Sequence, residues 1–182
     1  MTMQFEYEFD GLMLKVLNES NAKEVLHFYE RNKEEFNMYE STKPENFYTE
    51  NYMINNLRAE LNAILSGSHI RFFLFSSDIP DKILGTISFS HIFTGPTSSC
   101  ILGYKIDKDY RRLGLATSMI NKGLEIIRKD KSVHRIEAYI HPDNKPSLAL
   151  INKLGFIYEG TAFSYANIGG SWQDHERYVY IS

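Results

Sequence analysis

The alternation of hydrophobic and polar residues along the chain predicts strands and helices in a mixed order. Residues 12–17 have the composition of a strand, and a helix with one apolar face follows, capped by Ser20 or Asn21. Thr49 is placed to cap a second amphipathic helix. Between the two helices, residues 36–48 are polar and aromatic without a period, which predicts an irregular loop.

The middle and the end of the chain have a different pattern. Strands are expected at residues 70–75, 83–93 and 99–106, and their short connections favour antiparallel pairing. Then come a helix over 114–129, a strand over 133–140, a helix over 146–154 and two closing strands over 156–165 and 172–181. This order, β-α-α-β-β-β-α-β-α-β-β, predicts an α/β fold of the α+β kind, with about seven strands in a mixed, mostly antiparallel sheet and helices on both faces. Without a Pro/Gly-rich linker, residues 1–182 are expected to form a single domain.

Composition narrows the class of protein. The chain has 20 Lys and Arg against 23 Asp and Glu, a formal charge of -3, which gives no basic field for direct binding of nucleic acid. No apolar run reaches the length of a membrane span, and residues 1–10 lack the basic and apolar regions of an export signal. The one cysteine, Cys100, cannot form a disulfide within the chain. We therefore expect a cytoplasmic protein without a membrane partner.

The segment from Arg111 to Ala116 is the strongest local signal for chemistry. It stands between a strand and an amphipathic helix, and its small residues Gly114 and Ala116 allow a ligand to approach the backbone. The free N–H groups of a helix's first turn attract anions, and Arg111 and Arg112 add positive charge beside them. These features predict a cradle for a diphosphate. The alternative is a well-capped helix with two surface arginines.

Two sequence blocks resemble the GNAT acetyltransferases. The spacing Arg111-x-x-Gly114-x-Ala116 is similar to that family's Q/R-x-x-G-x-G/A motif, and residues 144–156 resemble its later Asn-containing helix with a terminal Gly-Phe. Further phrases, Leu102-Gly-Tyr104, Pro142-Asp-Asn-Lys-Pro-Ser147 and Trp172-Gln-Asp-His175, look like the RimJ/RimL branch, the ribosomal-protein alanine N-acetyltransferases. The resemblance covers the chain from about Leu12 to Tyr180.

The resemblance implies acetyl-coenzyme A as cosubstrate, with no metal, in a sheet that splays at the cofactor cleft. The strand that begins at Val133 is expected to diverge from the one that ends at Ile106. The residues expected to bind coenzyme A are Tyr104, Lys105 and Ile106 through their backbone, then Arg111, Arg112, Leu113, Gly114, Leu115, Ala116 and Thr117 in the loop, and Asn144, Ser147 and Lys153 beyond it. The histidines do not have the spacing of metal ligands, which agrees with that expectation.

The catalytic candidates follow from what direct attack of an amine on the acetyl carbonyl requires. Many members of the family have a tyrosine four residues before the Gly-Phe to protonate the leaving thiolate, but this chain has Ile151 there. Ser147 or water is then expected to donate that proton. A carboxylate can act as the base, with Glu40 as the first candidate and Glu137 as the second. For each acid, the alternative is a solvated group or a salt-bridge partner.

The resemblance also implies an acceptor, the α-amine of a protein or peptide such as a ribosomal-protein N-terminus. The loop over residues 36–48 is long and aromatic, which suits a slender chain with one terminal cation. Asp174 and His175 either anchor the last strand or line the substrate side. Two other functions stay open: acetylation of a small amine such as a polyamine or an antibiotic, and a non-catalytic module that binds acyl-coenzyme A. A monomer and a homodimer fit the sequence equally.

Overall fold

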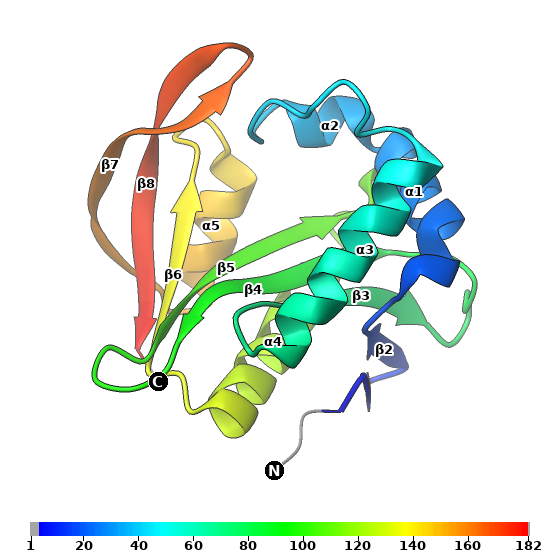
Figure 1. Ribbon diagram of the computed structural model, residues 1–182. Helices are drawn as coiled ribbons and strands as arrows, with labels where there is room; N and C mark the ends of the chain where they lie inside the picture. The colour runs from blue at the N-terminus through cyan, green and yellow to red at the C-terminus, as the bar shows by residue number, and fades with distance from the viewer. Residues whose placement is uncertain (1–3, 182) are drawn as a thin grey trace.

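The computed structural model describes residues 4–181, so residues 1–3 of the segment considered above for an export signal lie outside it. One eight-stranded sheet runs through the molecule in the order β1-β2-β3-β4-β5-β6-β8-β7 (Figure 1). Its strands are β1 (Glu6–Phe9), β2 (Leu12–Lys15), β3 (Ile70–Ser76), β4 (Gly85–Phe93), β5 (Ser99–Ile106), β6 (Arg135–Ile140), β7 (Ile157–Ile168) and β8 (Ser171–Ile181). All neighbours are antiparallel except β5 and β6.

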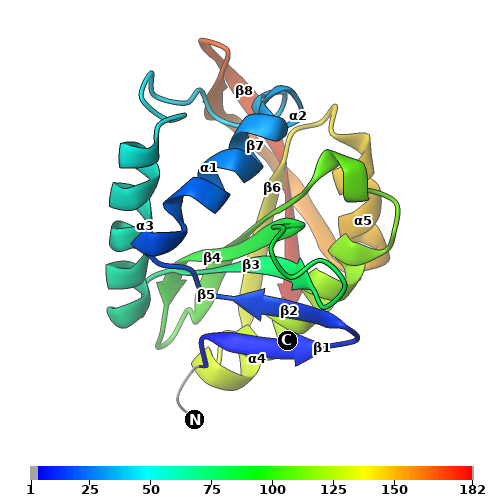
Figure 2. The same ribbon diagram turned by 90° about the vertical axis from the view of Figure 1, so that its right-hand side faces the viewer.

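Helices cover both faces of the sheet, as the sequence predicts (Figure 2). The helices are α1 (Ala22–Arg31), α2 (Lys33–Asn37), α3 (Glu50–Leu65), α4 (Leu115–Lys131) and α5 (Lys145–Lys153). One apolar core lies between the sheet and α4 and α5, and a second lies under α1 and α3. The α/β class is therefore confirmed. Within residues 4–181, no helix is both long enough and apolar enough to cross a membrane.

Two elements of the structure were not expected from the pattern. The strand β1 adds an eighth member at the sheet edge, and Asp10-Gly11, with φ of 47° and 72°, makes the tight turn that joins it to β2. The short helix α2 forms where a loop was predicted to begin, because Phe36 has a buried place under α1. Both differences arise because tertiary contacts stabilise segments whose own periodicity is weak.

The helix ends show which local signals decide the structure. The hydroxyl of Thr49 accepts a hydrogen bond from the N–H of Tyr52 at 3.2 Å, so Thr49 caps α3 as predicted. Before α1 the side-chain cap is instead Asn18, whose Oδ1 accepts from the N–H of Ser20 at 2.9 Å. That bond caps the 3-10 turn over Glu19–Asn21, which leads into α1. Asn21 is the N-cap residue of α1, as one of the two expected alternatives has it, but its side chain makes no capping hydrogen bond.

The pairing of β5 with β6 opens the sheet. These parallel strands are in register only from Ser99–Ile101 against Arg135–Glu137. Beyond that point β5 continues to Ile106 and β6 to Ile140 without pairing with each other, although each still pairs with its other neighbour. The two strands therefore diverge into the V-shaped opening that the family resemblance implies. On the other side of the sheet, α4 approaches closely because Gly123 has no side chain: a Cβ there would lie 2.5 Å from Cδ1 of Ile87. The middle of α4 is thereby packed directly on β4.

Candidate active site

The start of α5 brings Ser147 to the open V between β5 and β6. Asn144 caps this helix, since its Oδ1 accepts from the N–H of Ser147 at 3.2 Å, and Pro146 occupies the first turn. The phenol oxygen of Tyr104, on β5, lies within hydrogen-bond distance of the Ser147 hydroxyl and 3.4 Å from the Ser147 carbonyl oxygen. Burial raises the pKa of Tyr104 to about 12, so the phenol stays protonated. Ile151 is buried in the core, away from any polar role.

A buried acid fixes the end of β5 beside the predicted diphosphate cradle. Asp107 is fully buried, and its carboxylate accepts from Nε of Arg31 at 2.5 Å and from Nδ2 of Asn32 at 3.2 Å. It also accepts from the N–H of Asp109 at 3.1 Å, which caps the 3-10 turn Lys108–Tyr110. Burial raises the pKa of Asp107, but these three donors outweigh it and hold that pKa below the usual range.

The cradle itself has an uncapped helix N-terminus. Gly114 is the N-cap residue of α4 in the left-handed conformation, with φ of 80°, and no side chain caps the helix. No acidic residue lies in the first turn, and Arg111 and Arg112 are exposed just before it. The first N–H groups of α4 are therefore available to an anion, with two arginines beside them. The structure brings together the two features that the sequence predicted here.

Glu40 contacts the sheet at β5, through the side chain of Lys105. Its carboxylate forms ion pairs with Lys43 at 2.5 Å and with Lys105, on β5, at 3.0 Å. Burial raises the pKa of Glu40, but the charges of Lys105 and Lys43 outweigh it and lower that pKa. The carboxylate is thus held ionised by two ammonium groups, which weakens it as a proton acceptor. The ion pairs also connect the loop over residues 38–49, here called the acceptor loop, to β5.

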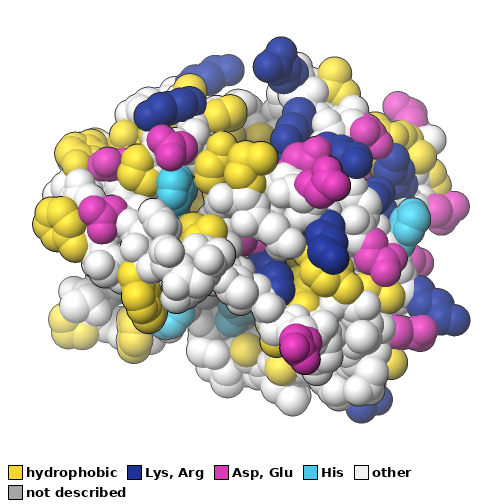
Figure 3. Space-filling view, turned by 90° about the horizontal axis from the view of Figure 1, so that it is seen from above, with side chains coloured by type: hydrophobic (Ala, Val, Ile, Leu, Met, Phe, Trp, Pro, Cys, Tyr) yellow, Lys and Arg dark blue, Asp and Glu magenta, His cyan; other side chains and the backbone are white. Residues whose placement is uncertain are grey.

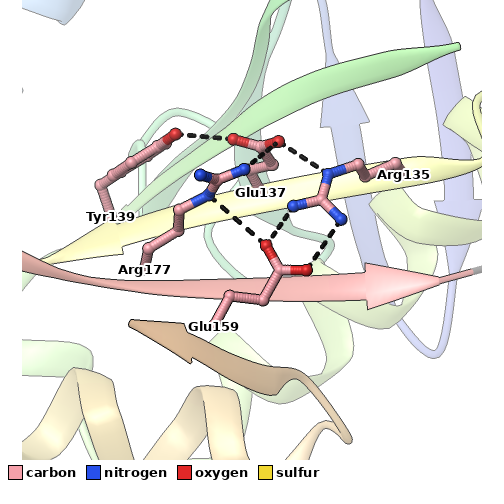
Figure 4. Close-up of polar contacts among 5 residues, drawn as sticks. All are labelled: Arg135, Glu137, Tyr139, Glu159 and Arg177. Atoms are coloured by element: carbon pink, nitrogen blue, oxygen red, sulfur yellow. Dashed lines mark hydrogen bonds and ion pairs between the residues drawn. The ribbon is translucent and has the colours of Figure 1, made fainter. Parts of the chain in front are cut away.

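Glu137 belongs to a polar network on the same face of the sheet (Figure 4). Its carboxylate is 2.8 Å from Nε of Arg135 and 3.2 Å from Arg177, and it accepts from the hydroxyl of Tyr139 at 2.6 Å. Glu159 pairs with both arginines and closes the network. Burial raises the pKa of Glu137, but the Tyr139 and Arg135 hydrogen bonds and the charge of Arg177 outweigh burial and lower that pKa. Glu137, like Glu40, has two cationic partners.

A row of rings crosses the open face of the sheet above this network. Tyr39, from the acceptor loop, lies 5.6 Å from His141, and His141 lies 5.7 Å from His175. The ring of His175 is 5.1 Å from Tyr165, which stacks on Tyr139 at 4.2 Å and 5°. We call these five residues the aromatic wall. Because Tyr139 lies two positions past the last residue of β6 that pairs with β5, the wall borders the V.

The acceptor loop and the β7–β8 hairpin meet above the V. The N–H of Thr42 donates to the carbonyl oxygen of Asn167 at 3.0 Å, and the N–H of Gly169 donates to the Thr42 hydroxyl at 3.1 Å. Seen from above, apolar and charged side chains are interspersed over this face, and Lys, Arg, Asp and Glu are most numerous on the side of the helices α1 and α3 (Figure 3). The exposed rings of Phe163 and Trp172 belong to this hairpin. The site is therefore enclosed by segments that are far apart in the sequence.

Several residues named from the sequence lie at the edge of this arrangement. Leu113 is exposed in the loop before α4, and Leu115, Ala116 and Thr117 are half-buried in its first turn. Lys153 is exposed in the last turn of α5, roughly 9 Å along the helix axis from Ser147. Among residues 4–181, no group of three or more His, Cys, Asp or Glu side chains is arranged to hold a metal ion.

The side-chain partners in the site were not found from the sequence. Tyr104 was named only for its backbone, and neither the phenol contact with Ser147 nor the lysine partners of Glu40 has a local signal. The alternation of side chains along a strand does predict that Tyr104 and Lys105 lie on opposite faces of β5. That signal does not say which elements lie opposite them.

Comparison with known proteins finds a family model and relatives that are all acetyltransferases. Residues 12–157 match the family model described as Acetyltransferase (GNAT) domain. The [ribosomal protein uS5]-alanine N-acetyltransferase of Escherichia coli (strain K12) is 29% identical over 172 residues, which cover 91% of this chain and 85% of that protein. The probable N-acetyltransferase YjcK of Bacillus subtilis (strain 168) is 25% identical over 165 residues, 91% of each chain.

Solved structures of acetyltransferases have the same fold as this chain. The ribosomal-protein-S5-alanine acetyltransferase from Vibrio fischeri superposes with a TM-score of 0.91 at 26% identity, over 98% of this chain and 97% of the other. Mycobacterium smegmatis RimJ, solved in complex with CoA-disulfide, superposes with a TM-score of 0.88 at 20% identity, over 94% and 82% of the two chains. The second similarity is one of fold.

Proposed function

The chain belongs to the GNAT acetyltransferase family and is an acetyl-coenzyme A-dependent N-acetyltransferase, and we propose that its acceptor is the α-amine at a polypeptide N-terminus. The acetyl donor is a substrate that binds and leaves in each turnover. The residues of the V and of the first turn of α4 have the chemistry to hold it.

The diphosphate of coenzyme A fits the uncapped start of α4. The backbone N–H groups of Leu115, Ala116 and Thr117 are proposed to bind its oxygens, with Arg111 and Arg112 neutralising the charge. Gly114 is required because its left-handed backbone brings Leu113 and the helix start around the anion without a side chain in the way. We assign the adenosine side of the ligand to the exposed Lys153, whose ammonium is free to meet a phosphate.

The pantetheine arm fits the open edge of β5. An antiparallel strand presents the backbone groups of alternate residues to each neighbour. The N–H of Asp107 donates to the carbonyl oxygen of Leu84, so the alternation turns the backbone groups of Lys105 toward Thr86 of β4 and not toward the V. Tyr104 and Ile106 therefore offer their N–H and C=O groups to the V. The contribution of Lys105 is instead its side chain, which binds Glu40. Asn144, at the facing end of α5, keeps its amide NH₂ for an amide of the arm, because only its Oδ1 is used in capping.

The chemical step needs a proton for the departing thiolate. Ser147 is proposed to donate it, since its hydroxyl lies in the V at the start of α5 and Ile151 leaves no phenol one turn further along the helix. The Tyr104 phenol beside it can return a proton to Ser147. Backbone N–H groups of the splayed strand polarise the acetyl carbonyl.

One observation favours a peptide terminus over a polyamine or an antibiotic with several amines. Glu40 and Glu137, the two acids at the V, each have two cationic partners already. A polycation needs several free carboxylates to pair its ammonium groups, whereas a peptide terminus brings one charge and an extended apolar chain. The aromatic wall and the hairpin rings suit such a chain. The relatives from Escherichia coli and Vibrio fischeri carry names that specify an alanine on a ribosomal protein, so a ribosomal-protein N-terminus is our proposed acceptor.

Steady-state kinetics test the acceptor. The measurement is kcat/KM for a short peptide with a free alanine terminus, compared with spermidine and with an aminoglycoside, at saturating acetyl-coenzyme A. We expect the peptide to be at least about tenfold better, which corresponds to about 1.4 kcal/mol of transition-state binding. Faster acetylation of spermidine or of the aminoglycoside would contradict the proposed acceptor and leave the family and its donor in place.

A further inference from the structure

The amine that attacks the acetyl group must first lose a proton, because an ammonium has no lone pair. Neither acid at the V is well suited to take that proton. Glu40 lies between Lys43 and Lys105, and Glu137 lies between Arg135 and Arg177, so protonating either one would break two ion pairs. The proton acceptor is therefore to be sought among the other titratable side chains that border the V.

His175 is placed to serve that purpose. It lies on β8, and the register Ile140 with Glu176 puts it beside the end of β6, where the V is widest. Its side chain is buried, at 5% exposure, within the aromatic wall. The rings of His141 from β6 and Tyr165 from β7 contact it, and Asp174 is its neighbour on its own strand.

The two histidines of the aromatic wall use Nδ1 in opposite ways, since one donates a hydrogen bond through it and the other accepts one. Nδ1 of His175 is 3.3 Å from the carbonyl oxygen of Gln173, which can only accept, so Nδ1 carries the hydrogen. Nε2 of the neutral His175 ring then holds the lone pair, and no described residue donates to it. His141 is the reverse, since its Nδ1 accepts from the N–H of Asp143 at 3.1 Å and its remaining nitrogen carries the hydrogen.

The surroundings keep the His175 ring neutral. Burial lowers the pKa of His175, and the neighbouring His141 lowers it further, while the Gln173 carbonyl and Asp174 act in the opposite direction. The net shift is downward from 6.5, so the ring is mostly uncharged at neutral pH and its lone pair is available. A phenol such as Tyr165 cannot compete, because burial raises the pKa of that group.

We propose that Nε2 of His175 accepts the proton of the acceptor ammonium, directly or through one water, before the amine attacks. The N–H bond of the ammonium breaks, and its proton forms the imidazolium of His175. The freed lone pair forms the C–N bond to the acetyl carbon, the C–S bond breaks, and the thiolate takes a proton from Ser147. The nitrogen of the new amide gives up its second proton, which returns to the Ser147 oxygen through water or the neighbouring Tyr104 hydroxyl. The imidazolium then releases its proton to solvent, so one proton is produced for each acetyl transferred. This inference rests on the proposed function.

The test compares His175→Gln with the wild type at two pH values. The α-amine of a peptide has a pKa of about 7.7–8.0, so it is mostly protonated at pH 7 and mostly neutral near pH 9. We expect kcat/KM to fall by about thirtyfold at pH 7 and by less than about threefold at pH 9, because a neutral amine needs no base. An equal loss at both pH values, or no loss at pH 7, would show that His175 does not take the proton.

Two comparison variants keep the result specific. His27→Gln, an exposed position on α1, should match the wild type at both pH values. Glu40→Gln should lose activity equally at pH 7 and pH 9, because its ion pairs position the acceptor loop. A loss confined to pH 7 in Glu40→Gln would instead return the base to that acid.

A measurement on the wild type covers the case in which His175→Gln does not fold. Nitrogen-15 NMR of the histidine rings should show His175 neutral at pH 7 with its hydrogen on Nδ1. A charged ring at pH 7, or a hydrogen on Nε2, would overturn the proposal. The pH comparison uses the α-amine of the peptide, whose neutral form predominates near pH 9. A preference for spermidine would contradict the peptide acceptor, and the NMR measurement would still test His175 separately.

Discussion

The phenol of Tyr104 and the hydroxyl of Ser147 are hydrogen-bond partners across the open V of the sheet. One comes from β5 and the other from the first turn of α5, so the contact joins the two elements that border the cofactor cleft. Because burial raises the pKa of Tyr104 to about 12, its proton is retained at neutral pH and can be shared with Ser147. The proton for the leaving thiolate can therefore come from a pair of hydroxyls rather than from a single side chain.

Removing the Ser147 hydroxyl should affect the chemical step. In Ser147→Ala we expect kcat to fall by about ten- to a hundredfold, with KM for acetyl-coenzyme A almost unchanged. Steady-state kinetics with varied donor concentration provide the measurement. An unchanged kcat would mean that water protonates the thiolate, and a rise in KM alone would make Ser147 a binding residue.

Removing the Tyr104 hydroxyl should have a smaller effect of the same kind. Tyr104→Phe keeps the ring in its half-buried place and leaves Ser147 without its partner, so we expect kcat to fall by about three- to tenfold. The double variant with Ser147→Ala should be no slower than Ser147→Ala alone, because the phenol acts through the serine. Additive losses in this double-mutant cycle would show that Tyr104 acts independently.

The diphosphate cradle predicts a loss of binding at Gly114. In Gly114→Glu, a carboxylate near the first N–H groups of α4 should repel the diphosphate and weaken acetyl-coenzyme A binding by about a hundredfold or more, as measured by calorimetry. Gly114→Asn is the matched control, since asparagine tolerates the left-handed backbone and carries no charge. Its affinity should fall much less than that of Gly114→Glu. Equal losses in both variants would point to backbone strain in place of charge.

Asp107 should make stability depend on pH in the acid range. Because its pKa is lowered in the folded protein, its contribution is fully present above the unfolded value of about 3.9 and is lost as pH falls through the folded value. Asp107→Ala should cost about 3–5 kcal/mol at pH 7, since it leaves the guanidinium of Arg31 without its buried partner. Urea unfolding at pH 7 and near pH 3 measures both effects, and the difference between variant and wild type should shrink in acid. A constant difference would contradict this assignment.

The sequence predicted the parts of this structure that depend on local chemistry. Thr49 is a helix cap in any context that offers it free N–H groups, and Gly114 is one of few residues suited to the left-handed start of α4. The diphosphate cradle could be located for the same reason. The strand β1 was missed because its Glu and aromatic residues alternate over only four positions, and pairing with β2 decides its structure.

The side-chain partners could not be predicted, because they depend on how distant elements pack. Lys105 meets Glu40 only when the acceptor loop folds over β5, and Tyr104 meets Ser147 only when α5 starts beside the V. His175 was left between two roles, anchoring β8 or lining the substrate site. Its ring contacts with His141 and Tyr165 exist only once three strands are side by side.

The central claim, acetyl transfer to a polypeptide α-amine, is tested most directly by one competition within a single molecule. A peptide with a free alanine terminus and one internal lysine is incubated with the protein and acetyl-coenzyme A, and tandem mass spectrometry locates the acetyl group. The account predicts acetylation at the terminal nitrogen, with at least about tenfold less on the lysine. Acetylation mainly on the lysine, or no transfer to the peptide at all, would contradict it.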